Sequence, residues 1–113
     1  MDKRLTYHHL GIPTTIRIEG EVYLRDYKCY HYGFENSAYG IEYMRYDDDC
    51  PLPEIVKTKP HIAFEVENVY DYIKNKNIII EPNSPSEGNI VAFIEEDSML
   101  IELIQIMKSI TRI

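Results

Sequence analysis

Histidines and glutamates recur at matching places in two stretches of the chain. Residues 9–12 (HLGI) and 61–64 (HIAF) both run histidine, apolar, small, apolar, and residues 41–43 (IEY) resemble residues 101–103 (IEL). Imidazole nitrogens and carboxylate oxygens together suit a divalent transition metal (Zn, Ni, Mn, Fe or Co) that keeps positions open for water or substrate. The pattern predicts one metal site built from both stretches: His9, Glu42, His61 and Glu102.

Glu102 is the strongest of these signals, because it stands in an almost wholly apolar run, residues 99–104 (MLIELI). A buried carboxylate without a partner is strongly destabilising, so an arginine, a set of donors or a metal ion should compensate it. Arg45 is the main arginine candidate, although it would face away from Glu42 on its own strand. The competing interpretation of the two histidines is a structural, hydrogen-bonding role, which is the more common one for a histidine in a strand.

The elements that would position these residues are mostly strands. In the first half, aromatic and β-branched runs predict strands over residues 7–14, 21–24, 27–33 and 39–46, with a turn at residues 36–37. Residues 47–60 hold three aspartates and three prolines, so regular strand pairing is not expected there.

In the second half, residues 61–66 predict a strand, and Asn68 is a suitable N-cap for a helix from Val69 to about residue 75. Val69, Tyr72 and Ile73 would share one face of that helix. A strand over residues 77–81 follows, then a loop over residues 82–88. Residues 90–95 and 99–107 predict a closing hairpin that turns at residues 96–98.

The spacing of the candidate ligands differs between the two stretches. His9 and Glu42 are 33 positions apart, whereas His61 and Glu102 are 41 apart. The difference of eight is roughly two helical turns of about 3.6 residues. We therefore predict an α+β fold of two β-rich repeats forming a cupped mixed sheet, in which the first repeat has lost or shortened its helix. The expected division is one domain over residues 1–113, with repeat one at about 5–47, a connector at 48–60 and repeat two at about 61–107.

Side-chain alternation in strands decides which residues face the cup. In the first strand His9 shares a face with Gly11, opposite the face of His8, so His9 is the predicted partner of His61 unless a bulge reverses the register. Met44 and Tyr46 share a face with Glu42 and are predicted to touch a ligand. His31, in a polar tyrosine-rich strand, is expected to be exposed.

Composition limits the partners and the compartment. A net charge of -7 argues against nucleic acids and anionic membranes, and leaves small molecules or cations as the expected ligands. Two cysteines without a framework, no apolar leader at the start and no long apolar run predict a cytoplasmic protein. Many isoleucines, lysines, asparagines and tyrosines indicate a bacterial genome rich in A and T. A homodimer is expected, since two small sheets leave edges that pairing can cover.

Three segments carry a resemblance to a known family. Residues 7–12 (YHHLGI), 60–66 (PHIAFEV) and 99–104 (MLIELI) resemble the vicinal oxygen chelate superfamily, which includes glyoxalase I, extradiol dioxygenases, methylmalonyl-CoA epimerase and bleomycin-resistance proteins. In that family each βαβββ module opens on a strand that can begin with a ligand histidine and closes on a strand that can carry a ligand glutamate. His9 and His61 match the opening positions, and Glu42 and Glu102 match the closing ones.

The resemblance implies a glyoxalase-like, divalent-metal-dependent enzyme of the lyase, isomerase or epimerase type that acts on a small oxygenated metabolite. Glu42 or Glu102 would be the general base, and the sequence does not choose between them. The short first module and the short chain leave few loops for a large substrate such as a glutathione adduct. A metal-free small-molecule binding protein of the bleomycin-resistance type is the alternative, and a vestigial module that assembles with another protein is a third interpretation.

Overall fold

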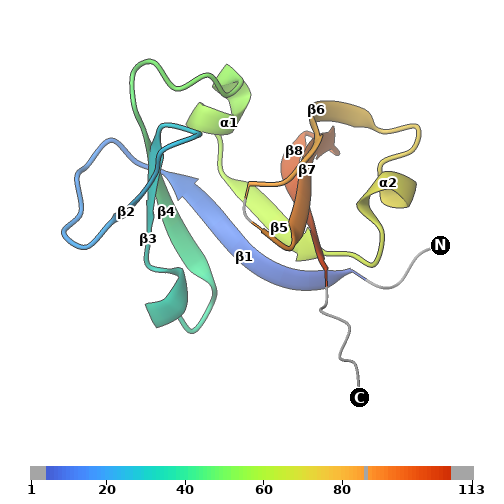
Figure 1. Cartoon of the computed structure of the whole chain (residues 1–113), viewed down its shortest axis with the longest axis horizontal. Coiled ribbons are helices and arrows are strands. Elements are labelled where there is room, and N and C mark those ends of the chain that lie inside the picture. Colours follow the sequence, from blue (N-terminus) through green and yellow to red (C-terminus); the bar gives the residue numbers. More distant parts are fainter. Residues whose placement is uncertain (1–4, 86, 108–113) are drawn as a thin grey trace.

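The two repeats meet where their opening strands pair. The computed structural model describes residues 5–85 and 87–107. Within these residues, eight strands form one mixed sheet in the order β2-β3-β4-β1-β5-β8-β7-β6 (Figure 1). The strands are β1 (Thr6–Pro13), β2 (Val22–Leu24), β3 (Cys29–Tyr32), β4 (Ile41–Tyr46), β5 (His61–Glu65), β6 (Asn77–Asn83), β7 (Asn89–Glu96) and β8 (Met99–Ile106).

The pairing pattern of β1–β4 is repeated in β5–β8. In each repeat the opening strand pairs in parallel with the closing strand, and the two middle strands continue outward as an antiparallel meander. The two opening strands, β1 and β5, pair antiparallel at the centre of the sheet. The predicted α+β fold of two β-rich repeats in a curled mixed sheet is therefore confirmed.

The predicted loss of a helix from the first repeat is also confirmed. In the second repeat, α2 (Val69–Tyr72) lies between β5 and β6, whereas residues 14–21 connect β1 to β2 without a helix. The helix α2 is shorter than the predicted 69–75, because the chain leaves helical geometry before Asn75, whose φ is 64°. The expected cap is present, since the Asn68 side chain accepts a hydrogen bond from the backbone N–H of Asp71.

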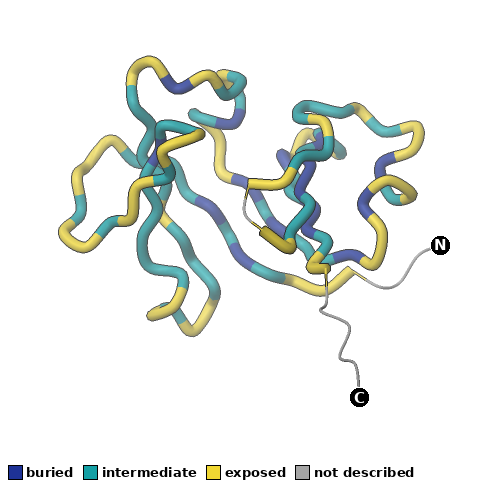
Figure 2. The backbone as a smooth tube through the Cα atoms, viewed as in Figure 1, coloured by how far each residue is buried: buried dark blue, intermediate teal, exposed yellow. Residues whose placement is uncertain are grey.

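The hydrophobic core lies mainly in the second repeat (Figure 2). There α2 covers one face of the sheet, and its buried residue Val69 and its buried C-cap residue Ile73 join a cluster with Ala92, Ile94 and Leu103. Partly buried Tyr72 packs against the same cluster, as the predicted apolar helix face requires. The first repeat has fewer buried side chains, so its strands are held more by cross-strand pairing than by a helix-covered core.

The connector contains a helix that the sequence did not predict. Helix α1 (Glu54–Thr58) begins directly after Pro53 and buries Val56. The prolines do prevent strand pairing here, as expected, but a proline just before a first helical turn removes no needed hydrogen bond. A short 3-10 helix, Phe34–Asn36, similarly replaces the simple turn expected at residues 36–37.

The closing hairpin agrees with its predicted position. Strands β7 and β8 pair in continuous register from Asn89 with Ile106 to Glu96 with Met99. The two residues between them, Asp97 and Ser98, both have positive φ, at 54° and 64°. Two consecutive positive φ values are typical of the tight turns that match the twist of a hairpin. None of the described helices is long and apolar enough to cross a membrane.

Replacing the cap of α2 should lower stability without changing the fold. Asn68→Ala removes the acceptor for the Asp71 N–H, and loss of such a cap costs about 1 kcal/mol. Urea unfolding of the variant measures this cost. Asn68→Asp is the matched control and should retain most of the stability, because a carboxylate oxygen can accept the same hydrogen bond. Equal stability of Asn68→Ala and the wild type would contradict the assigned cap.

Candidate metal centre

The centre of the sheet brings the two predicted histidines together. His9 on β1 lies opposite Ala63, and His61 on β5 lies opposite Gly11, so each histidine stands over the small residue of the other repeat. The two imidazole rings are nearly perpendicular, and their Nε2 atoms are 3.3 Å apart. Both residues are buried.

The small residue two positions after each histidine makes room for the imidazole ring of the other repeat. A Cβ added at Gly11 would lie less than 3.0 Å from three ring atoms of His61. Gly11 also lacks the positive φ of the other described glycines, so it is required by the close ring and not by its backbone conformation. The space that the sequence analysis placed beside each repeat's own histidine is filled by the histidine of the other repeat.

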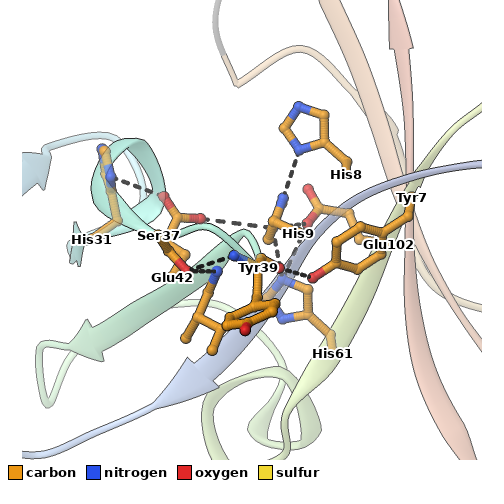
Figure 3. A network of polar contacts seen from close by, with 10 residues as sticks. Tyr7, His8, His9, His31, Ser37, Tyr39, Glu42, His61 and Glu102 are labelled. Carbon is orange, nitrogen blue, oxygen red and sulfur yellow. Dashed lines mark hydrogen bonds and ion pairs between the residues drawn. The ribbon is translucent and has the colours of Figure 1, made fainter.

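Glu102 completes a group of three donors. It lies on β8, paired with Ala63 of β5, and its Oε1 is 3.1 Å from His61 Nε2 and 3.3 Å from His9 Nε2 (Figure 3). One donor atom from each of the three residues lies within 4.8 Å of the other two, so the group could hold a metal ion.

The donor geometry suits such an ion. Zinc-type bonds of about 2.0–2.2 Å to a shared ion imply donor separations of roughly 3.0–3.6 Å, and all three separations fall in this range. Two imidazole Nε2 atoms also converge on one carboxylate oxygen and on each other. With a proton on each nitrogen, two N–H groups would face one another across 3.3 Å, whereas a cation would accept both lone pairs.

Glu42 lies beside this group and not within it. On β4, paired with Gly11, it places Oε1 3.6 Å from His9 Nε2 and Oε2 3.1 Å from His31 Nδ1. Of the four predicted ligands, the structure therefore brings three into one group and holds the fourth at its edge. The assignment of Glu42 as a ligand stays a prediction.

His31 corrects an expectation, because it is not fully exposed. Its side chain is 31% exposed and faces the cup, where it contacts Glu42. The pairing of His31 with Met44 across β3 and β4 puts both on the cup face. Counting alternate residues from the buried Cys29 would have placed His31 on this face, but the polar tyrosines around it masked the signal.

His8 was expected on the opposite face, and the structure shows it at the cup as well. The register of β1 and β5 shifts between Tyr7 and His9, and this irregularity lets both His8 and His9 line the cavity. His8 Nδ1 is 2.8 Å from His9 Nδ1, and the His8 ring stacks on Phe34 at an interplanar angle of 3°. His9 Nδ1–H can thus donate to His8, which leaves Nε2 aimed at Glu102; a partner on the second ring nitrogen is typical of metal-binding histidines.

Electrostatics favour an ionised Glu102. Burial alone would raise its pKa, but hydrogen bonds and charge interactions with His61 and His9 outweigh burial and lower the pKa to about 2. Burial acts to lower the pKa of His9, and the hydrogen bond to Glu102 with the charges of Glu102 and Glu42 raises it overall. Burial and the neighbouring His9 lower the pKa of His8, which favours a neutral ring whose Nδ1 can accept a hydrogen bond from His9.

Arg45 does not compensate Glu102. It faces away from the cup. On the outer face its Nε donates to Glu21 at 3.1 Å, and its guanidinium lies 4.0 Å from the centre of the Tyr30 ring. The two histidines therefore supply the compensation that the apolar run around Glu102 requires.

A cavity of about 380 Å³ opens at this group of three donors. Met44 and Tyr46 line it, as their shared face with Glu42 predicted, while their contact with a ligand stays a prediction. Val56 of α1 forms part of the wall, so the helix missed in the connector contributes to the site.

Burial raises the pKa of Cys29, also on the wall, to about 12, so its thiol is protonated and a poor nucleophile.

The architecture belongs to the class of α+β folds in which two four-stranded repeats make one curled sheet around a cup. Solved structures with this fold include a hypothetical protein of Bacillus halodurans, with a TM-score of 0.71, 18% identity, and coverage of 97% of this chain and 100% of that one. Methylmalonyl-CoA epimerase of Mycobacterium tuberculosis is also similar, with a TM-score of 0.58, 14% identity, and coverage of 96% and 93%. No family model and no curated protein matches the sequence.

Filling the space beneath His61 should destabilise the protein. Gly11→Ala places a methyl group against the His61 ring, and such overpacking typically costs about 1–3 kcal/mol. Urea unfolding and the ring resonances of His61 report the change. Ala63→Gly is the reciprocal control; it adds no atoms beside His9 and should cost only about 0.5–1 kcal/mol. Unperturbed His61 resonances in Gly11→Ala would contradict the packing described.

The metal-free protein should gain most from the Glu102–histidine contacts between about pH 4.5 and 6.5. The pKa of Glu102 is lowered from 4.5, so its contribution is complete above pH 4.5 and is lost as the pH falls toward 2. The pKa of His9 is raised from 6.5, so its contribution is complete below pH 6.5 and is lost as the pH rises through the higher value of the folded state.

The difference in free energy of unfolding between the wild type and Glu102→Gln, after chelator treatment, measures this contribution. We expect a maximum on the order of 2 kcal/mol within that pH window, as for hydrogen bonds to charged groups. A difference that grows steadily above pH 6.5 would have the wrong sign for a raised His9 pKa.

Proposed function

We propose that this chain is a member of the vicinal oxygen chelate superfamily and a divalent-metal-dependent enzyme of the lyase, isomerase or epimerase type. The convergence of His9 Nε2, His61 Nε2 and Glu102 Oε1 at the end of a cavity carries the proposal. A fold shared with a methylmalonyl-CoA epimerase supports it, because epimerases of that name belong to the superfamily that the sequence resembles.

The three converging residues would be the ligands, and the ion they hold would supply Lewis acidity toward adjacent oxygens of a small metabolite. Glu42 is better placed than Glu102 to be the general base. Its Oε1 lies 3.6 Å from the nearest ligand nitrogen, whereas Glu102 Oε1 contacts both histidines. A carboxylate beside the ligands remains available to take a proton from a carbon next to the bound oxygens.

His31 would hold Glu42 in place for that transfer. Its Nδ1, 3.1 Å from Glu42 Oε2, leaves the other carboxylate oxygen directed toward His9 and the cavity. His8 would hold His9 through the contact between their Nδ1 atoms. These two histidines were not among the predicted site residues.

The alternative is a metal-free binding protein that holds its ligand in the same cup. One observation favours it: no buried side-chain nitrogen or oxygen within residues 5–85 and 87–107 lacks a hydrogen-bond partner. Glu102 is satisfied by the two histidines alone, so the protein can fold without an ion.

Elemental analysis of the protein, purified without a histidine tag and without added metal, tests the choice. We expect about one transition-metal ion per chain in the wild type. Glu102→Gln should bind at least tenfold less tightly, since it removes an anionic ligand from a group of three. Glu42→Gln is the matched control and should retain the ion, because Glu42 lies outside the group.

The outcome separates the two functions. Absence of metal even after incubation with Zn, Ni, Mn and Fe(II) would reject the enzyme and leave the metal-free binding protein. Loss of the ion in Glu42→Gln as well as in Glu102→Gln would instead show Glu42 to be a ligand, and general base catalysis by a free Glu42 would have to be abandoned.

A further inference from the structure

The cavity has one polar end and a largely apolar body. The polar end is the cluster of histidines and glutamates already described. Away from it, the wall is formed mainly by aliphatic side chains that come from β2, the connector, β6, β7 and β8. Among them are Leu24, Leu52, Val56, Ile80, Val91 and Ile104.

No lysine or arginine is found among the described residues that line this cavity. Lysines and an arginine that are adjacent in sequence to lining residues make contacts outside the cavity. Lys28 Nζ lies 2.6 Å from Asp49, and Lys57 Nζ donates to the carbonyl oxygen of Cys50 at 3.1 Å. Arg45 contacts Glu21 on the outer face.

At the polar end, the charges of the two glutamates and of a divalent cation would cancel, so no further charge is required from the ligand. Glu42 and Glu102 are the only carboxylates of this end within residues 5–85 and 87–107, and a divalent cation would offset their two negative charges. An anionic group on the remainder of a ligand would then meet mainly aliphatic carbon, with the neutral polar side chains of Tyr27, Asn83 and Asn89 and no cation. Transfer of an unpaired charge into such surroundings is strongly unfavourable.

Resting on the proposed function, we propose a substrate class: a small molecule with adjacent oxygens at one end and an uncharged, apolar body. Molecules with further anionic groups, such as coenzyme A thioesters, phosphate esters and dicarboxylates, would be excluded. The cavity of about 380 Å³ lies toward the small end of ligand sites, which span roughly 300–1,000 Å³. It suits a body of a few carbon atoms or one ring.

Hydroxamates test the substrate class, because they present two adjacent oxygens to a metal ion and carry any chosen tail. Acetohydroxamate, hexanohydroxamate and the monohydroxamate of succinic acid would be titrated calorimetrically into the zinc-loaded protein. Affinity should rise at least tenfold from the acetyl to the hexanoyl compound, since each buried methylene contributes roughly threefold to fourfold. The succinyl compound should bind no better than acetohydroxamate.

A lysine placed at the rim of the cavity should make the protein bind the succinyl compound more tightly. Ile106 lines the cavity and is 41% exposed, so Ile106→Lys adds a cation with little risk to folding. It should strengthen binding of the succinyl compound at least fivefold and weaken binding of the hexanoyl compound. Met99→Lys is the matched control, because Met99 is on the same strand and 42% exposed but does not line the cavity.

Hexanamide and acetamide, which lack the chelating N-hydroxyl group, separate the substrate class from the metal. If the protein takes up no zinc but binds hexanamide more tightly than acetamide, the proposed enzyme fails and the apolar ligand class stands. If zinc binds and tail length has no effect, or the succinyl compound binds best to the wild type, the ligand class is overturned and the metal site stands.

Discussion

The antiparallel pairing of β1 with β5 is the constraint on which the rest of the site depends. It brings the opening strands of two repeats, 52 positions apart at their histidines, into one register. In that register each histidine stands over the small residue of the other repeat. The parallel neighbours β4 and β8 then carry one glutamate each to the same place, because Glu42 pairs with Gly11 and Glu102 with Ala63.

The two halves of the site are nevertheless unequal. Glu102 contacts both histidines, whereas Glu42 contacts His9 and His31. The difference follows from the partner on the adjacent strand. In the first repeat a third imidazole, His31 of β3, which pairs with Met44, competes for the carboxylate. The equivalent residue of the second repeat, which pairs with Ile104, is Val91 of β7, and its side chain offers no hydrogen bond. The two repeats thus have similar strand pairing, but their glutamates make different side-chain contacts.

Much of this arrangement could be predicted from the sequence, since it rests on local pattern. The repeated histidine motifs and the glutamate in an apolar run predicted the strands, the repeat and the residues at the cup. Two features were missed, because both depend on how the strands pair. The irregularity in β1 that turns His8 inward depends on pairing with β5, and the cup-facing side of His31 depends on pairing with β4. Helix α1 was missed because its prolines were taken as breakers, although Pro53 stands where a helix tolerates it.

The missing helix of the first repeat also accounts for the uneven use of tyrosine. In the second repeat α2 covers the outer face of the sheet, which is accordingly aliphatic. The outer face of the first repeat has no such helix, and its paired residues include Tyr23, Tyr30, Tyr32 and Tyr43. A tyrosine covers the strands with its ring and keeps a hydroxyl for water, so it tolerates a half-exposed position that leucine or isoleucine fills poorly. Arg45, over the Tyr30 ring and bonded to Glu21, adds a polar outer layer. Tyrosines and this ion pair therefore replace a helix as the cover of the first repeat. In both repeats the cover lies on the outer face, opposite the face that carries the histidines and glutamates of the cup.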